Sequence, residues 1–422
     1  MKKFNIVLAA CMAAGLLLLS AAEIDGLYVW RGGSYTRYDV GEMLFSNDSM
    51  TLSGITLDVS DIDSITFRQP EEVKVVSDTL YVAFDGESAS VTPQGVEGIT
   101  ATIDGADVTL MNENTDREMT FVLSGESSQG SFTYDGSYKT CIRLAGVSLK
   151  SSSGAALNIK CGKRIALELL DGTENYLEDA ADSLGQKAAL YCKGHLEVSK
   201  GGTLTVKGNN THAIKTKEYM LVKASAGGLT VSGAEGDGIH AGQYFKMNGG
   251  TVTVSGVKGD GIQAEATQDG DDDDGQLIVK GGTLNVDVTA RDVAALKSDS
   301  LLTISGGTLT LTTSGDGDKG IKSKDDLSIS GGDLHITQSG KYIVENNDPG
   351  YVVAVKAAGN LDISGGSITI ENTAEAGKGL SADGNITTSE ADAQLTVNIK
   401  ANGSGAAEVP DGGLGIGHGL DR

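Results

Sequence analysis

Two almost identical hexapeptides, Gly236–Ala241 (GDGIHA) and Gly259–Ala264 (GDGIQA), lie 23 residues apart and differ only at His240 and Gln263. Looser copies surround them, and each copy carries an apolar anchor at the position that Ile239 holds in the first hexapeptide. The anchors are Leu190, Ile214, Ile239, Ile262, Leu296, Ile321, Val355 and Leu380, at successive spacings of 24, 25, 23, 34, 25, 34 and 25 residues. A period of about 24 residues with two longer steps indicates a repeat architecture.

A second motif, a glycine pair followed by an alternating strand, keeps step with the anchors. Its copies are Gly201–Val206, Gly249–Val254, Gly281–Val286, Gly306–Leu311, Gly331–Ile336 and Gly365–Ile370. Alternation of Leu, Val or Ile with polar residues, mostly Thr, predicts a half-buried β-strand. Three such short strands per unit of about 24 residues predict a right-handed parallel β-helix, whose coils stack ~4.8 Å apart so that equivalent positions form rows.

The composition favours an all-β protein. The chain has 59 Gly and 4 Pro among 422 residues, and helical periodicity is nearly absent, so a solenoid accounts for the length as one long domain. The formal net charge of −24 excludes nucleic-acid binding through the overall field and suits divalent cations. Of the four cysteines, Cys11 lies in the N-terminal segment described next. The other three, Cys141, Cys161 and Cys192, allow at most one bridge and leave at least one free thiol, and no disulfide is assigned.

The N-terminus reads as a targeting segment. In residues 1–22, Lys2 and Lys3 precede an apolar run that ends in small residues suited to signal-peptide cleavage. This pattern predicts a secreted or cell-surface protein. Lipidation at Cys11, which follows a lipobox-like Leu-Ala-Ala, is the alternative that the sequence leaves open.

Three regions are expected after the leader. Residues 23–72 lack the repeat and form a small β segment, either a cap for the solenoid or an adhesion module. Residues 73–400 form the β-helix, and residues 401–422 form a Gly-rich disordered tail. No run after the leader is long and apolar enough to span a membrane.

Several motifs carry a family resemblance over roughly residues 73–400. Besides the Gly-Asp-Gly-Ile copies, they are Lys319–Leu327 (KGIKSKDDL), Ile329–Gly332 (ISGG) and Leu170–Asn175 (LDGTEN). Together they resemble the secreted bacterial carbohydrate-binding β-helix family, which is related in fold to pectate lyases. The resemblance implies calcium and the binding of cellulose or pectic polysaccharides. It assigns no ligand by family position, so the candidate residues below come from the rows.

The residue after each anchor is expected to point outward, because side chains alternate along a strand. This outward row contains Tyr191, Lys215, His240, Gln263, Lys297, Lys322, Lys356 and Ser381. Cations and amides in line on an acidic protein predict a surface that binds the carboxylates or hydroxyls of a linear polysaccharide, with the six residues from Lys215 to Lys356 in contact with it. A solvated strand face with Lys chosen for solubility remains the alternative.

Tyr219 and Tyr244 each lie five residues after their anchors and are expected to stack. Such a pair forms a flat platform for a sugar ring or, alternatively, packs at a corner of the fold.

Two acidic residues, Asp237 and Asp260, lie two positions before their anchors and are expected to stack ~5 Å apart. Carboxylates this close repel unless a proton or a cation lies between them, so the pair predicts a calcium site. The alternative is a pair of turn residues, since Asp-Gly suits tight turns.

Further acidic residues extend the predicted calcium ligands. These are Glu265, Asp269, Asp271 and Asp273, in and near a run that does not fit the EF-hand pattern, and the weaker candidates Asp316 and Asp318. A solvated acidic loop is the other interpretation.

Three functions remain in competition. The leading prediction is calcium-stabilised, non-catalytic binding of cellulose or polygalacturonate. The second is a calcium-dependent polysaccharide lyase, in which a cation neutralises a uronate and a Lys takes the adjacent proton. The third is a structural adhesin without saturable glycan binding.

Overall fold

The structure is a computed structural model that describes residues 26–31, 34–39, 43–46, 48–52, 54–66, 76–181, 185, 187–267, 273–345, 348–389 and 396–401. The chain divides into two compact units, within residues 1–74 and 75–422. The expected signal peptide, with the alternative lipidation site Cys11, and the expected tail from residue 402 lie outside the described residues. Among the described residues, no helix has both the length and the apolar character needed to cross a membrane.

The smaller unit consists of two antiparallel three-stranded sheets. One sheet contains β1 (Leu27–Arg31), β2 (Ser34–Tyr38) and β6 (Ser64–Thr66), and the other contains β3 (Met43–Ser46), β4 (Ser49–Leu52) and β5 (Ile55–Asp58). A short 3-10 helix, η2 (Val59–Asp61), follows β5. The core of this unit is separate from that of the larger unit and includes Val29, Met50 and Leu52.

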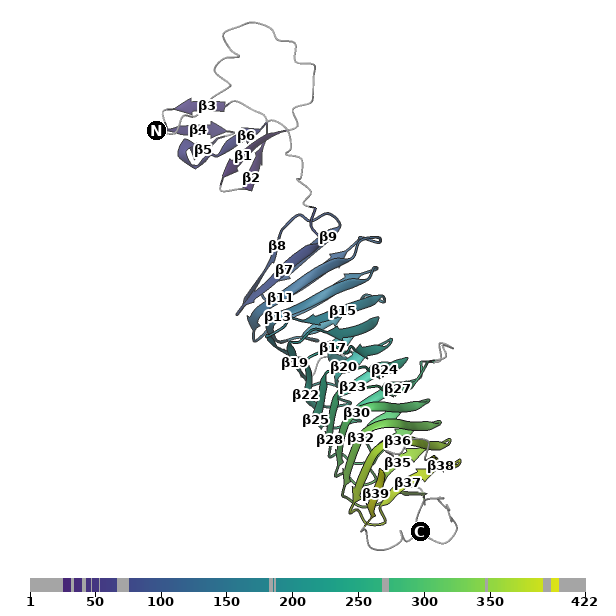
Figure 1. The fold of residues 1–422 in the computed structure, drawn as a ribbon. Helices are drawn as coiled ribbons and strands as arrows, with labels where there is room; N and C mark the ends of the chain where they lie inside the picture. Colours follow the sequence, from purple (N-terminus) through teal and green to yellow (C-terminus); the bar gives the residue numbers. More distant parts are fainter. Residues whose placement is uncertain are drawn as a thin grey trace. The chain divides into compact units, whose positions relative to one another are not determined.

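The larger unit is built on a twelve-stranded sheet in which every pairing except β9 with β10 is parallel (Figure 1). Its strands are β9 (Ile99–Asp104), β10 (Asp107–Asn112), β12 (Ser131–Gly136), β14 (Leu157–Ile159), β17 (Ala188–Cys192), β20 (His212–Thr216), β23 (Ile239–Gly242), β26 (Ile262–Glu265), β29 (Ala294–Ser298), β31 (Lys319–Ser323), β35 (Val353–Ala357) and β37 (Lys378–Ala382).

A nineteen-stranded sheet supplies the remaining wall around the same core. Its strands are β7 (Thr79–Asp85), β8 (Ser88–Thr92), β11 (Met119–Ser127), β13 (Thr140–Lys150), β15 (Arg164–Leu169), β16 (Glu174–Glu178), β18 (His195–Ser199), β19 (Thr203–Gly208), β21 (Met220–Val222), β22 (Gly228–Ala234), β24 (Tyr244–Met247), β25 (Thr251–Val257), β27 (Gln276–Val279), β28 (Thr283–Val288), β30 (Leu302–Thr313), β32 (Leu327–Gln338), β36 (Leu361–Asn372), β38 (Ile386–Thr388) and β39 (Thr396–Ala401). A small hairpin joins β33 (Ile343–Glu345) to β34 (Asp348–Gly350).

The prediction of a right-handed parallel β-helix with three short strands per coil is wrong. The strands of the larger unit join into two main sheets rather than three. The unit is therefore an all-β, closed structure in which the twelve-stranded sheet and the additional strands surround one core. Segments expected as separate strands merge, and β30, β32 and β36 each run for 12 residues. Their second glycines, Gly307, Gly332 and Gly366, have φ of 94°, 95° and 94°, a conformation that lets a strand bend where other residues would break it.

The alignment of the anchors is confirmed. Ile214 pairs with Ile239, Ile239 with Ile262, and Ile262 with Leu296, and all four side chains are fully buried. Gly261, the residue before the anchor Ile262, has no room for a side chain, because a Cβ added there would collide with Val286 and lie 2.6 Å from the backbone oxygen of Ala295. The hexapeptides therefore set the register of the twelve-stranded sheet.

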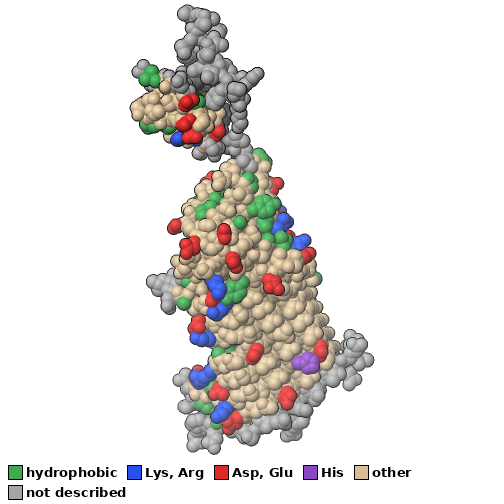
Figure 2. All heavy atoms as spheres, turned by 90° about the vertical axis from the view of Figure 1, so that its left-hand side faces the viewer, with side chains coloured by type: hydrophobic (Ala, Val, Ile, Leu, Met, Phe, Trp, Pro, Cys, Tyr) green, Lys and Arg blue, Asp and Glu red, His purple; other side chains and the backbone are tan. Residues whose placement is uncertain are grey.

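Figure 2 shows the face of the larger unit that lies toward β19, β22, β25 and β28. Uncharged polar side chains and backbone predominate on it, and charges of both signs are scattered. The clustered charges described next belong to the twelve-stranded sheet and its edges.

Candidate functional site

The outward row lies in register along the twelve-stranded sheet, as predicted. Lys215 pairs with His240, His240 with Gln263, Gln263 with Lys297, Lys297 with Lys322, and Lys322 with Lys356. The expected exposure is only partly right, because the lysines and Gln263 are half-buried and His240 is buried. Neighbouring side chains cover the row, so its charges act in a partly dehydrated setting.

The row two positions before the anchors is a ladder of side-chain acceptors. His212 Nδ1 accepts the Asp237 N–H at 3.0 Å, Asp237 Oδ1 accepts the Asp260 N–H at 2.8 Å, and Asp260 Oδ1 accepts the Ala294 N–H at 2.8 Å. Each side chain thus accepts a hydrogen bond from a backbone N–H of the next repeat along the chain. This role was not foreseen, although the position of the residues in one row was visible in the sequence.

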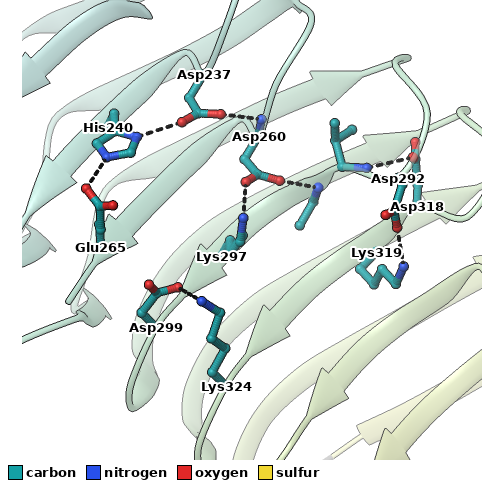
Figure 3. A network of polar contacts seen from close by, with 12 residues as sticks. Asp237, His240, Asp260, Glu265, Asp292, Lys297, Asp299, Asp318, Lys319 and Lys324 are labelled. Carbon is teal, nitrogen blue, oxygen red and sulfur yellow. Dashed lines mark hydrogen bonds and ion pairs between the residues drawn. The ribbon is translucent and has the colours of Figure 1, made fainter. Parts of the chain in front are cut away.

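The second oxygens of Asp237 and Asp260 contact a histidine ring and a lysine ammonium group, respectively (Figure 3). Asp237 Oδ2 lies 2.7 Å from His240 Nδ1, and His240 Nε2 lies 2.8 Å from Glu265 Oε2. Asp260 Oδ2 accepts a hydrogen bond of 2.7 Å from Lys297 Nζ. We refer to Asp237, His240, Glu265, Asp260 and Lys297 as the charged network.

Gln263 connects the two parts of the charged network. With its amide oriented so that nitrogen faces the acceptors, it donates to Asp237 Oδ2 at 3.2 Å and to Asp260 Oδ2 at 3.3 Å. The predicted like-charge stack therefore exists, and protein donors surround it.

The environment sets the protonation of these groups. Burial alone would raise the pKa of Asp237, but the hydrogen bond from His240 and the nearby imidazoles lower it below its usual value. Burial lowers the pKa of Lys297, yet Asp260 outweighs this effect and raises it overall. Burial lowers the pKa of His212 to about 4, so this ring is neutral at pH 7 and its 3.3 Å approach to Asp237 Oδ2 is not an ion pair.

The donors around Asp237 and Asp260 fit calcium poorly, because a calcium ion between them would displace His240 or Lys297 and needs several oxygen ligands. Glu265, with its side chain 47% exposed, and the exposed Asp273 are more accessible. Asp269 and Asp271 lie outside the described residues.

The two residues of the third predicted acidic group, Asp316 and Asp318, lie in different environments. Asp316 is exposed, and its Oδ1 accepts the Lys341 N–H at 2.9 Å. Asp318 is fully buried, with its two oxygens accepting the N–H groups of Val293 and Gly315 at 3.2 and 2.7 Å. Burial raises the pKa of Asp318 to about 6, against the lowering effect of these hydrogen bonds.

Two lysines further along the outward row, Lys322 and Lys356, differ from Lys297. We call them the lysine pair, and no carboxylate partner is found for either within the described part of the chain. Burial, reinforced by the neighbouring charges of Lys319 and Lys297, lowers the pKa of Lys322. Lys215, at the other end of the row, also has a pKa lowered by burial.

The predicted tyrosine stack is present at the corner between the two sheets. The rings of Tyr219 and Tyr244 lie 4.7 Å apart at an interplanar angle of 10°. His195 extends the stack, with its ring 4.4 Å from that of Tyr219. Tyr219 donates to Glu197 Oε1 at 2.9 Å. His195 was missed, although it precedes Tyr219 by the same step of 24 residues that separates the anchors.

Comparison with known proteins places these features in a family. The sequence profile of a family described as carbohydrate-binding domain-containing protein matches residues 104–319 and 287–414. A carbohydrate-binding domain-containing protein of Acetivibrio thermocellus is 25% identical over 172 residues, which cover 39% of this chain and 56% of that relative. The match thus spans little more than half of the relative's length.

A solved structure has a similar fold. It is described as a polysaccharide lyase-like protein from C. thermocellum, as a gadolinium derivative. The TM-score is 0.50 at 22% sequence identity, and the match covers 60% of this chain and 96% of the other. At this identity the likeness concerns the fold.

Proposed function

This chain belongs to the family of carbohydrate-binding domain-containing proteins, and from that premise we propose that it binds an acidic polysaccharide along the outward row without cleaving it. Polygalacturonate is the preferred polymer and cellulose a weaker one, because the row offers cations more than apolar platforms. The proposed location is outside the cell or on its surface.

The lysine pair is the observation that carries this proposal. Lys322 and Lys356 are adjacent in register and half-buried, and burial, reinforced by the neighbouring positive charges, lowers the pKa of Lys322. A bound uronate would supply the missing carboxylate and relieve this repulsion. Strands repeat at ~4.8 Å, which matches roughly one sugar of an extended chain per strand.

Lys215 gives the same row a second contact about three strands from Lys297. Between them, His240 and Gln263 present an imidazole and an amide, although both are engaged with Asp237. We assign these two residues to hydroxyl groups rather than to carboxylates, because the acidic side chains beneath them would repel an anion.

Calcium belongs to the proposal at the second of the acidic groups that the sequence suggested, and not between Asp237 and Asp260. We propose that Glu265 and Asp273 contribute ligands to it. Glu265 is half-exposed and Asp273 exposed, and calcium favours several carboxylate oxygens in an irregular loop. Bound there, it would bridge to the carboxylates of an acidic polymer.

The test compares Lys322→Ala/Lys356→Ala with Lys258→Ala. Lys258 is exposed and paired with Glu235 at 2.6 Å, so it controls for loss of one surface cation. Calorimetry with oligogalacturonates, with and without chelator, should show at least a tenfold loss of affinity only in the double variant. Affinity should also fall as salt screens the charges. Unchanged affinity in the double variant contradicts the proposal.

A polysaccharide lyase is the second candidate, because the lowered pKa values of Lys215 and Lys322 are what a general base requires. In that reaction the neutral amine takes the proton from C5, next to the uronate carboxylate, the C4–O4 bond breaks, and a C4=C5 double bond forms. The leaving O4 takes up a proton from water and departs as a hydroxyl group. Absorbance of the unsaturated product, lost in Lys215→Ala or Lys322→Ala, would establish it. No saturable glycan binding at all would favour the adhesin.

A further inference from the structure

Two histidines and an aspartate meet beside the charged network in an arrangement suited to a metal other than calcium. His212 lies on β20, His240 on β23, and Asp237 directly before β23. His212 Nδ1, Asp237 Oδ2 and His240 Nδ1 all lie within 4.8 Å of one another. Asp237 Oδ2 is 3.3 Å from His212 Nδ1 and 2.7 Å from His240 Nδ1.

We propose that His212, Asp237 and His240 form a three-ligand site for a divalent transition metal of the zinc and cobalt type. Imidazole nitrogens suit zinc, copper and nickel, whereas calcium selects oxygen ligands. Zinc binds His and Asp at about 2.0–2.2 Å, so neighbouring ligands around a tetrahedral ion lie about 3.4 Å apart. The distances from Asp237 Oδ2 to the two nitrogens reach this value with changes of less than about 1 Å. The two nitrogens lie within 4.8 Å of each other and need to approach by at most about 1.4 Å.

The surroundings of the three ligands are those of a metal site. A ligating histidine usually donates its other ring N–H to a carboxylate, which fixes its orientation. His240 has this arrangement, because its Nε2 faces Glu265 Oε2 at 2.8 Å. Gln263 donates its amide to Asp237 Oδ2 at 3.2 Å and orients the carboxylate in the same way.

Binding exchanges two hydrogen bonds for metal–ligand bonds. The metal takes the place of the proton that His240 Nδ1 and Asp237 Oδ2 share, and this proton leaves to solvent. His212 Nδ1 gives up the Asp237 N–H to coordinate the ion. The side chain of His212 is 20% exposed, compared with 8% for His240, so the ion enters on the His212 side and a water completes the coordination.

The metal site shares His240 with the proposed polysaccharide face, and Glu265, which orients His240, is also a proposed calcium ligand. The three metal ligands themselves include two nitrogens, and none of them belongs to the lysine pair or to the proposed calcium ligands Glu265 and Asp273. A tenfold excess of calcium is therefore expected to leave the bound transition metal in place.

The experiment uses the full chain without an affinity tag, stripped of metal. Titration with Co²⁺ should give the visible absorption of a four-coordinate site, and calorimetry with Zn²⁺ should give one ion per chain. His212→Ala and His240→Ala should each weaken Zn²⁺ binding at least 100-fold. Glu265→Gln should weaken it about 10–100-fold, as expected for a residue that orients a ligand.

His335→Ala is the matched control. His335 also faces a carboxylate, with Nε2 3.2 Å from Asp333 Oδ1, but both side chains are about half-exposed and no third ligand joins them among the described residues. Its Zn²⁺ affinity should equal that of the wild type. Circular dichroism checks that each variant is folded, and if His240→Ala unfolds, His212→Ala and Glu265→Gln decide the outcome.

Three results would overturn the inference. One is the absence of saturable Co²⁺ or Zn²⁺ binding by the wild type. Another is equal binding by the wild type and His212→Ala, which would place any bound ion elsewhere. Displacement of Zn²⁺ by excess calcium would also count against it, since it would indicate an oxygen-only site.

Discussion

The charged network and the lysine pair lie on the same sheet and share the outward row, but their lysines have opposite electrostatic surroundings. In the charged network, Lys297 faces Asp260 at 2.7 Å and its pKa is raised. In the lysine pair, Lys322 has Lys319 and Lys356 as neighbours and its pKa is lowered. The lysines are the same type of residue at equivalent positions on adjacent strands.

The neighbouring row decides the difference. It offers Asp260 near Lys297, but Lys319 and Val353 beside the lysine pair. Lys319 in turn pairs with Asp292 at 2.8 Å, so Asp292 offsets the positive charge around Lys322 only in part. A lysine of the outward row therefore stabilises the fold where the adjacent row offers it a carboxylate. Where the adjacent row offers none, the lysine is available to bind a ligand.

The largest expected effect is on stability in the charged network. Asp260→Ala leaves Lys297 Nζ and the Ala294 N–H without their acceptor in a buried setting, and should lower the free energy of unfolding by about 3–5 kcal/mol. Lys322→Ala, in the lysine pair, should change it by less than about 1 kcal/mol. Urea denaturation measures both. Equal effects would remove the distinction between the two regions.

A second comparison sets Asp237 against Asp318, a buried carboxylate with only backbone donors. The pKa of Asp318 is about 6 in the folded state and 3.8 when unperturbed, so between these values the folded state binds the extra proton. Stability from this group is therefore highest below pH 4 and falls as pH rises to 6, by up to about 3 kcal/mol.

Denaturation of wild type and Asp318→Asn at pH 4 and pH 6.5 tests this sign. The effect of the amide itself on the free energy of unfolding is the same at both pH values. It therefore cancels when the difference between wild type and variant at pH 4 is compared with that at pH 6.5. Wild type should gain stability relative to the variant on going from pH 6.5 to pH 4. Asp237, whose pKa is lowered, contributes in the opposite direction, since its stabilisation is lost on acidification. A relative loss for wild type at pH 4 would contradict the buried, raised Asp318.

The smallest expected effect separates the two lysines at alkaline pH. The raised pKa of Lys297 means that its stabilisation is present below pH 10.5 and is lost above it. The lowered pKa of Lys322 means that the folded state releases its proton first, so stability from this group rises as pH approaches 10.5. Each contribution should be below about 1 kcal/mol, because both side chains are partly exposed.

Lys297→Met and Lys322→Met, compared with wild type between pH 8 and pH 10.5, reveal these slopes. Relative to wild type, Lys322→Met should lose its advantage as pH rises, whereas Lys297→Met should remain at a disadvantage until higher pH. Parallel curves would mean that the two lysines share one environment.

Much of the candidate site was predictable because stacking in register is a local property. The alternation of anchors and polar residues determines which side chains form a row, and this is how Lys215, Tyr219 and Tyr244 were found. His195 and His212 were within reach of the same reasoning. The pairing of each carboxylate was not, because Asp260 contacts Lys297 from a different strand, 37 residues away.

By itself, the sequence determined the all-β character, the register of the anchors and the membership of each row, since period-two alternation and fixed spacing encode them. Only the tertiary structure decided that two main sheets form rather than three, because glycines at positive φ let single strands turn a corner. It also decided which charges are satisfied. The geometry between neighbouring strands determines which donors each carboxylate meets, and burial determines how strongly they act on it. A pattern of residue types does not contain the distances between these donors and the carboxylates.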